Sequence, residues 1–379
     1  MDAKRAIARI FTDLADALET GRMGRRLAVG VTTLGSEHGV AEVVRGAEQA
    51  AQLDPNLEVV LIGPRVESHL LQEECDSEDT AHRRMEELLN EGRLAAAVTM
   101  HYPFPVGVAT VGRILTPARG KAMFLATTTG TSAAERVPAL VKNAVYGLAV
   151  AKALGLKEPT VGILNVDGAR QAERRLKELA GRGYPIAFAE TVRAEKSAIM
   201  RGNDLLAGSP DVMICDTLTG NLLMKIFSAY TTGGSYEALG YGYGPGVGPG
   251  WKRIVNIVSR ASGAPVIAGA IAFAAACAAA GLPEILAAEW EAARRAGIED
   301  LLTSPAQAEE KGEVKPPPAK PTGAEIGGVD VLVIEDAARE LWRHGIYAET
   351  GMGCEGPVIL VAPEDKEEAL RLLKGGGYL

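Results

Sequence analysis

The sequence has few aromatic side chains, few cysteines and no excess of positive charge, and each shortage excludes a class of protein. Aromatic residues make up 5% of the 379 residues, so aliphatic side chains and alanine must fill the core. The net charge is −8, whereas a nucleic-acid-binding protein needs a concentrated basic face. Four scattered cysteines cannot form a disulfide framework, and we expect reduced thiols in a cytoplasm. No cluster of His and Cys has ligand spacing, so no metal is predicted.

Membrane-spanning runs and nucleotide motifs are also missing. The longest apolar stretch, residues 264–282, contains Pro265 and two glycines, and we interpret it as a buried strand and helix rather than a membrane span. The N-terminal residues lack the apolar core of a signal peptide. GxxxxGKS, GxxxxGKT and GxSxG do not occur, and the one GxGxxG, at residues 351–356, joins two predicted strands rather than a strand and a helix. Nucleotide-binding and α/β-hydrolase interpretations therefore lose support, and no cofactor is predicted.

Strand-like and helical segments alternate through the first 300 or so residues. The apolar runs that read as strands are residues 26–32, 57–62, 95–100, 122–127, 160–166, 212–215 and 253–258. Helical periodicity begins at about residue 40, covers residues 81–91, 134–154 and 169–180, and begins again at residue 222. Strand, crossover helix and strand in succession predict an α/β fold with a mostly parallel sheet covered on both faces.

A Pro- and Lys-rich stretch at residues 309–322 predicts an extended, exposed linker. It divides the chain into a body, residues 1–308, and a small C-terminal module, residues 323–379. Within the module, the pattern predicts a βαββα unit over residues 330–334, 335–344, 346–350, 357–362 and 364–374. Because a unit of this size has a small core, we expect it to dock on the body.

The loop GMGCEGP places Cys354 among glycines, between two apolar strands. Glycines permit positive φ and close approach of a substrate, and successive N–H groups could stabilise a thiolate or an oxyanion. A glycine-rich hairpin turn with an incidental cysteine is the alternative. Cys215 and Cys277 lie in apolar segments and are interpreted as core residues, whereas acidic neighbours disfavour a thiolate at Cys75.

The run DTLTGNLLMK places an anion-type turn after a strand that ends at Asp216. Free N–H groups and the helix dipole favour an anion there, at Thr219, Gly220 and Asn221, and the Thr219 and Asn221 side chains add donors. Lys225, about one turn into the predicted helix, could reach a phosphate. An ordinary N-cap explains the same residues, since Thr and Asn are favoured at helix starts.

A second hydroxyl-rich turn, LATTTGTSAAE, lies between a predicted strand and a helix. Thr131 and Ser132 are its candidate anion-binding residues, by the same argument. Ser132 and Glu135 also fit a capping box, which is the structural alternative.

Two histidines follow predicted strands. The loop GSEHG after the first strand contains Ser36 and His38, either of which could contact a ligand. His101, in MHYPFPVG, is a candidate general acid or base. The uncharged glycine-rich run 238–250 cannot form a regular helix or strand, and we expect either a closing lid or a loop that packs against a partner.

Two longer runs resemble the phosphate acyltransferases of the PlsX type. The segments are KNAVYGLAVAKALGLKEPTVGILN, residues 142–165, and PDVMICDTLTGNLLMK, residues 210–225. The resemblance covers roughly residues 25–290, and its most specific part is the DxxTGN turn. It implies a body of two α/β lobes with a cleft, of the isocitrate-dehydrogenase type. The chain departs from that family where TLGSEHG replaces an early GGD, and where GNxEGRD is absent.

These departures resemble a second family, the alpha (small) subunit of protein C of the glycine, sarcosine and betaine reductase complexes. MHYPFPVGVATVGR, ALGYGYGPG, SRASGAPV and GMGCEGP all fit, and the resemblance then extends over nearly the whole chain. It implies that Cys354 carries an acetyl group, which inorganic phosphate releases as acetyl phosphate. It also implies an oligomer whose partners are the large (beta) subunit of protein C and an acyl-carrying selenoprotein.

In this interpretation the phosphate lies near Thr219 and Asn221 and the turn of Thr131 and Ser132, while His101 and His38 steer protons or phosphate. Two alternatives remain open at this point. One is a phosphate acyltransferase that acts on acyl-carrier protein in phospholipid synthesis. The other is a non-catalytic partner subunit.

Overall fold

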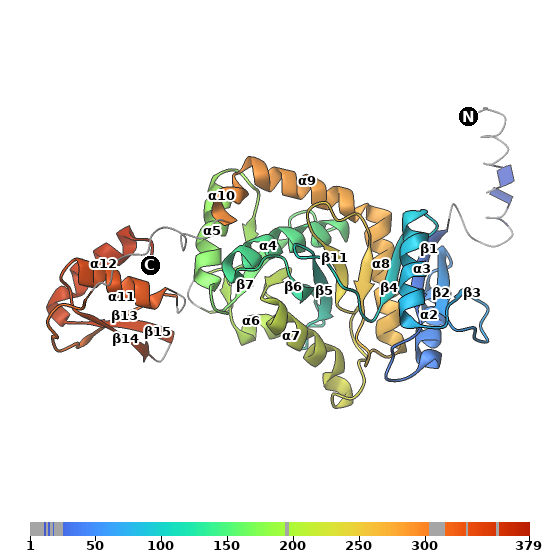
Figure 1. Ribbon diagram of the computed structural model, residues 1–379, viewed down its shortest axis with the longest axis horizontal. Helices are drawn as coiled ribbons and strands as arrows, with labels where there is room; N and C mark the ends of the chain where they lie inside the picture. Colours follow the sequence, from blue (N-terminus) through green and yellow to red (C-terminus); the bar gives the residue numbers. More distant parts are fainter. Residues whose placement is uncertain are drawn as a thin grey trace.

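The computed structural model describes residues 11–12, 14–15, 18, 26–193, 197–302, 315–330, 333–353 and 356–379. The body contains one twelve-stranded, mostly parallel sheet with helices on both faces (Figure 1). Its spatial order is β3-β2-β1-β4-β12-β11-β5-β6-β10-β7-β8, and β9 also pairs with β7. The predicted α/β class with a mostly parallel sheet is therefore confirmed.

The first half of the sheet is entirely parallel. Its strands are β3 (Leu71–Glu74), β2 (Leu57–Gly63), β1 (Leu27–Thr32), β4 (Ala96–Thr99) and β12 (Val255–Ile257). The helices that accompany it are α2 (Val40–Leu53), α3 (Glu78–Asn90) and α8 (Ala264–Ala280). Apart from the edge strand β3, these parallel strands are largely buried, because helices cover both faces of the sheet, and this accounts for their apolar runs.

The second half contains the only antiparallel pairs among the described strands of this sheet, β12–β11, β11–β5 and β5–β6. Its strands are β11 (Gly244–Val247), β5 (Ala109–Leu115), β6 (Ala122–Gly130), β10 (Val212–Ile214), β7 (Thr160–Leu164), β8 (Ala187–Phe188) and β9 (Ile199–Met200). Its helices are α4 (Arg136–Ala153), α5 (Ala169–Gly181), α6 (Gly202–Ala207), α7 (Thr217–Ala229), α9 (Leu282–Arg295) and α10 (Ile298–Leu302), with the 3₁₀ turn η1 (Tyr230–Thr232). In Figure 1, α4 and α9 lie on one side of the sheet, and α6 and α7 lie on the other.

Strand β11 joins the two halves, so the prediction that residues 238–250 contain no strand is wrong. The whole strand is buried between β12 and β5, which also excludes a mobile lid at this position. Gly244 has φ +88°, and a Cβ there would lie 1.8 Å from the carbonyl oxygen of Val111. Glycine is therefore required by close approach to β5, a contact that the sequence alone does not reveal.

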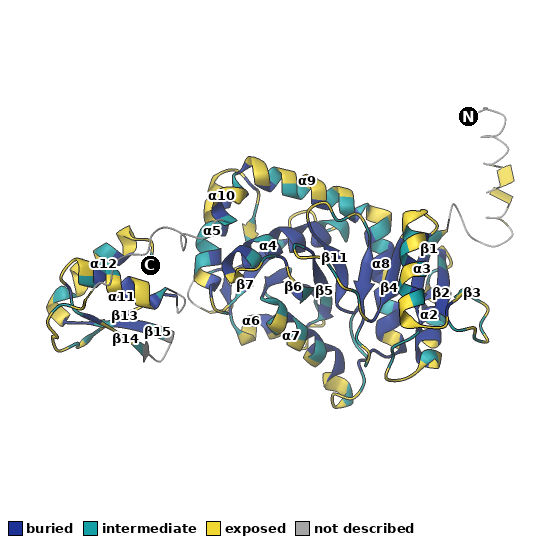
Figure 2. Cartoon of the chain, in the orientation of Figure 1, coloured by how far each residue is buried: buried dark blue, intermediate teal, exposed yellow. Residues whose placement is uncertain are grey.

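The Ala-rich run 264–282 was predicted as a strand and a helix, but residues 264–280 form the single helix α8. Pro265 lies in its first turn, where proline removes no intrahelical hydrogen bond. Figure 2 shows α8 largely buried against the sheet. Among the described residues no single helix is long and apolar enough to cross a bilayer, and α8 and α9 pass that test only as a pair bent by 63°.

The C-terminal module forms a separate antiparallel sheet of order β13-β15-β14. Its elements are β13 (Ala324–Gly327), α11 (Ile334–Arg343), β14 (Ala348–Gly353), β15 (Gly356–Val361), the 3₁₀ turn η3 (Pro363–Asp365) and α12 (Lys366–Gly375). The predicted βαββα order is confirmed, but the first described strand lies at 324–327, and residues 331–332 of the predicted strand 330–334 lie outside the described part of the chain. Ile334 instead begins the buried stripe of α11, with Ala337, Ala338 and Leu341 at helical spacing.

A buried carboxylate, Asp204, organises the loops around α6. It accepts hydrogen bonds from the N–H groups of Val192 (2.7 Å) and Arg201 (2.9 Å), and from the hydroxyls of Thr191 (2.9 Å) and Ser209 (3.1 Å). Burial raises the pKa of this carboxyl, but these hydrogen bonds outweigh burial and hold the pKa below its ordinary value. The ionised form therefore stabilises the fold.

We expect Asp204→Asn to lower the free energy of unfolding by about 2–3 kcal/mol at pH 7, because charged hydrogen bonds are lost. Since the folded pKa is depressed, this contribution is present above the unfolded value of about 3.9 and is lost as pH falls through the folded value. Urea unfolding at several pH values between neutrality and acid measures both effects. Equal loss of stability in wild type and variant on acidification would exclude this role for Asp204.

Candidate functional site

Three segments meet where the two halves of the sheet join: the loop after β1, the loop between β12 and α8, and helix α7. The N–H of Glu37 donates to the carbonyl of Arg260 (2.8 Å), which ties the first two segments together. The ammonium group of Lys225, on α7, donates to the hydroxyl of Ser259 (2.6 Å), which ties the second to the third. The carboxyl end of β12 and the helix after β10 therefore form one site.

Helix α7 begins at Thr217, five residues earlier than predicted, with Asp216 as its N-cap. The Asp216 carboxylate accepts from the N–H of Thr219 (3.1 Å) and from its hydroxyl (2.6 Å), and the Asp216 carbonyl accepts from the N–H of Gly220 (2.9 Å). Asn221 donates from Nδ2 to the carbonyl of Thr128 (3.2 Å) on β6. These predicted anion-binding donors are thus engaged with the protein itself, as the N-cap alternative describes.

Lys225 is the residue of this motif that faces the junction. Its ammonium group lies 2.7 Å from Oε1 of Glu237, and its side chain is 44% exposed. The Glu237 side chain is buried, and its other oxygen accepts from the hydroxyl of Ser262 (2.7 Å). A cation is therefore held at the junction by one partner from the segment after α7 and one from the loop after β12.

Ser36 and His38 form a compact turn at the same junction. The N–H of His38 donates to Oγ of Ser36 (3.1 Å), and Nε2 of His38 lies 3.2 Å from the carbonyl of Ala261. The His38 ring packs 5.2 Å from the ring of Tyr236, and His38 is exposed. An exposed imidazole beside the β12–α8 loop is available to a ligand.

His101 lines a pocket of about 330 Å³ between the two halves of the sheet. The pocket is bounded by Met100, His101, Tyr102, Pro103, Phe104, Thr129, Gly130 and Ile257. Behind it, Nε2 of the half-buried His82 lies 2.9 Å from the hydroxyl of Thr99, and burial lowers the pKa of His82. Because Ile257 precedes Ser259 by two residues, the pocket adjoins the Lys225 cluster along the chain.

The hydroxyl-rich turn after β6 differs from one of the two predictions made for it, the capping box. Helix α4 begins only at Arg136, and Glu135 caps it without a side-chain hydrogen bond, so the predicted capping box is wrong. The N–H of exposed Thr131 donates to the carbonyl of Val108 (3.3 Å), and the buried hydroxyl of Ser132 donates to Ala139 (3.3 Å). The backbone here completes β-sheet contacts rather than a helix start.

Cys354 and residues 309–314 of the predicted linker lie outside the described residues. Gly353 and Gly356, which precede and follow residues 354–355, are paired at the end of the β14–β15 hairpin. Burial raises the pKa of Cys277 to about 12, and it also raises the pKa values of Cys75 and Cys215. The three described cysteines are therefore poorly suited to act as thiolates.

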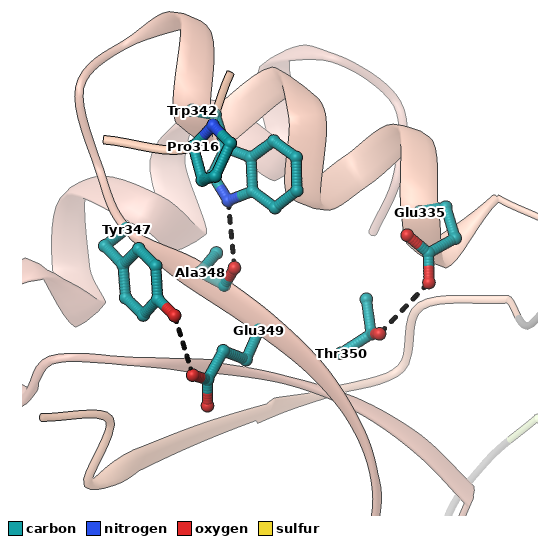
Figure 3. Close-up of a pocket in the computed structure, with 7 residues that line it drawn as sticks. All are labelled: Pro316, Glu335, Trp342, Tyr347, Ala348, Glu349 and Thr350. Carbon is teal, nitrogen blue, oxygen red and sulfur yellow. Dashed lines mark hydrogen bonds between the residues drawn. The ribbon is translucent and has the colours of Figure 1, made fainter. Parts of the chain in front are cut away.

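The module also contains a pocket of about 380 Å³ on β14. As Figure 3 shows, its walls are aromatic and acidic, and its lining residues are Pro316, Glu335, Trp342, Tyr347, Ala348, Glu349 and Thr350. The Trp342 indole donates to the carbonyl of Ala348 (2.9 Å), which fixes α11 against the strand that leads toward Cys354.

Sequence reasoning missed Glu237, Ser259 and Ser262. The signal for the two serines was present, because SRASG follows a short strand and precedes a helix, as the predicted anion turns do. Glu237 gave no signal, since the residues around it follow neither a helical nor a strand period.

Residues 27–360 match the protein-family model described as fatty acid synthesis protein. The chain is 55% identical to the "glycine/sarcosine/betaine reductase complex component C subunit alpha" of Peptoclostridium acidaminophilum, over 100% of this chain and 99% of that protein. It is 25% identical to the phosphate acyltransferase of Thermus thermophilus, over 53% of this chain and 70% of that protein. Among solved structures, a branched-chain phosphotransacylase from Enterococcus faecalis aligns at a TM-score of 0.48 and 17% identity, over 66% of this chain and 99% of that one.

Proposed function

Because the chain belongs to the fatty acid synthesis protein family, which its match over residues 27–360 establishes, we propose that it is an acyltransferase that gives acetyl phosphate. The acetyl group comes from an enzyme-bound thioester, and inorganic phosphate accepts it. In this proposal the chain works as the alpha subunit of component C in a glycine, sarcosine or betaine reductase complex.

The observation that carries the proposal is the extent of the similarity to component C subunit alpha. That similarity covers the entire chain, so it includes the body and the module with Cys354. The phosphate acyltransferase of Gluconacetobacter diazotrophicus, by contrast, is 36% identical over 23% of this chain. A shared module supports a step that uses both parts of the chain.

The chemistry requires two acyl transfers and no redox change. The Cys354 thiolate attacks the carbonyl carbon of the donor thioester, and the donor leaves as its own thiolate. An oxygen of phosphate then attacks the Cys354 thioester, the carbon–sulfur bond breaks, and the thiolate of Cys354 is restored. Because a thiolate is a good leaving group, positioning and charge neutralisation matter more than acid catalysis.

Lys225 supports a phosphate site at the junction, where Ser36, His38 and His101 offer further donors. Asp216 accepts from the N–H groups of Thr219 and Gly220, and Asn221 donates to Thr128, so these three residues serve this proposal by seating α7 on β6. The Thr131 and Ser132 turn adjoins Gly130 at the edge of the His101 pocket. The partners proposed are a large (beta) subunit and an acyl-carrying selenoprotein, in the cytoplasm and within an oligomer.

The test is arsenate-dependent hydrolysis of acetyl phosphate by the purified chain, alone and with its partner subunit. Acetyl phosphate acylates Cys354, arsenate then accepts the acetyl group, and the acetyl arsenate hydrolyses in water. We expect turnover that requires arsenate and saturates with acetyl phosphate. Turnover of long-chain acyl phosphates in its place would favour the phospholipid alternative, and no binding of acetyl phosphate would favour a non-catalytic subunit.

A further inference from the structure

We infer that Glu237 is a positioning residue that holds the ammonium group of Lys225 where phosphate binds. The inference rests on the proposed function, and it concerns a residue that does not itself contact phosphate. Glu237 lies eight residues beyond the end of α7, and its side chain is only 1% exposed.

The Glu237 carboxylate is fully supported by its surroundings. Oε1 lies 2.7 Å from Nζ of Lys225 and 3.4 Å from the hydroxyl of Tyr243, and Oε2 accepts from Ser262 (2.7 Å). Its backbone N–H donates to Ala261 (3.1 Å), and its carbonyl accepts from Gly263 (2.9 Å). The carboxylate therefore cannot move without breaking the β12–α8 loop, and it is a fixed anchor.

The Lys225 ammonium group has three donors, and the structure assigns two of them. Within the described part of the chain, the partners of this group are Glu237 and Ser259, so one N–H bond remains for a ligand. Since the side chain is 44% exposed, that remaining donor is accessible to an anion at the junction. Because the lysine side chain is flexible, only the contacts with Glu237 and Ser259 fix the direction of the ammonium group.

A buried carboxylate behind a lysine does not prevent phosphate binding. In protein kinases a lysine that contacts ATP phosphates is held by a glutamate, and the pair must be formed for activity. The Glu237 carboxylate is likewise behind the ammonium group, out of contact with solvent.

The test compares phosphate binding by the full-length wild-type chain and by Glu237→Gln, using titration calorimetry with inorganic phosphate and steady-state kinetics. Because a charged partner is lost, we expect Kd and KM for phosphate to rise about tenfold or more, with little change in KM for the acetyl donor. Glu42→Gln is the matched control. Glu42 is also buried and accepts from the Tyr236 hydroxyl and the Ala264 N–H, both at 2.7 Å, but it does not contact Lys225.

A double variant separates positioning from stability. Lys225→Met leaves the buried Glu237 without its cation and should lower Tm, whereas Lys225→Met with Glu237→Leu should recover Tm without recovering phosphate affinity. Recovery of both would mean that the pair is only structural and would overturn the inference. An unchanged phosphate Kd in Glu237→Gln would also overturn it, while the proposed function would stand. If the wild-type chain itself binds no phosphate, the proposed function fails first.

Discussion

Replacement of Cys354 by serine is expected to reduce arsenate-dependent hydrolysis of acetyl phosphate by on the order of 10³-fold or more. A thiol is partly ionised near neutral pH, whereas a serine hydroxyl needs a dedicated base to become a nucleophile. An oxygen ester at this position would also release its acetyl group more slowly, because an alkoxide is a poorer leaving group than a thiolate. The comparison requires initial rates over a range of arsenate concentrations.

Cys75→Ala provides the matched control for the serine variant. Cys75 is buried, and burial raises the pKa of its thiol, so its loss should leave the rate within about twofold. The same contrast should appear with iodoacetamide under native conditions, which we expect to label Cys354 and to spare the three buried cysteines. Turnover by Cys354→Ser at the wild-type rate would exclude Cys354 as the acetyl carrier and leave the body alone to carry the chemistry.

The predictable parts of the fold are the elements whose apolar side chains follow a single strand or helix periodicity. The apolar run 26–32 and the helical run 169–180 match β1 and α5 to within one residue. Strand β5 was missed because Gly112 and Arg113 interrupt its apolar pattern. Strand β11, with the sequence GPGV, carries no side-chain pattern, and its pairing with β12 and β5 and the close approach of Gly244 to β5 determine it.

The members of the candidate site that could be predicted are those that come after a predicted strand in the sequence. His38, His101 and Lys225 all lie near the junction, but the direction of the Lys225 side chain depends on Glu237 and Ser259, which come from other parts of the chain. No local pattern reports such a contact. The early start of α7 was, in contrast, available from the sequence, because Asp216 is of a residue type that is favoured at the N-cap.

Replacement of Gly220 by alanine should have the largest structural effect near the site. Gly220 lies in the predicted anion-binding turn, and a Cβ there would lie 1.8 Å from the carbonyl oxygen of Thr127 on β6. The clash is with backbone, so α7 must move away from the sheet. We expect a loss of about 3 kcal/mol in the free energy of unfolding, which exceeds the roughly 1 kcal/mol that alanine gains in helix propensity.

The displacement of α7 should also weaken phosphate binding, because α7 carries Lys225. Gly181→Ala is the matched control, since Gly181 ends α5 and nothing lies within 4 Å of the position of its added Cβ. That variant should be neutral or slightly more stable, by up to about 1 kcal/mol. Urea unfolding and phosphate titration of both variants decide the matter, because equal stability of the two would show that α7 has room to accept a side chain at position 220. A Gly220→Ala chain that loses stability but keeps wild-type phosphate affinity would instead separate the seating of α7 from the phosphate site.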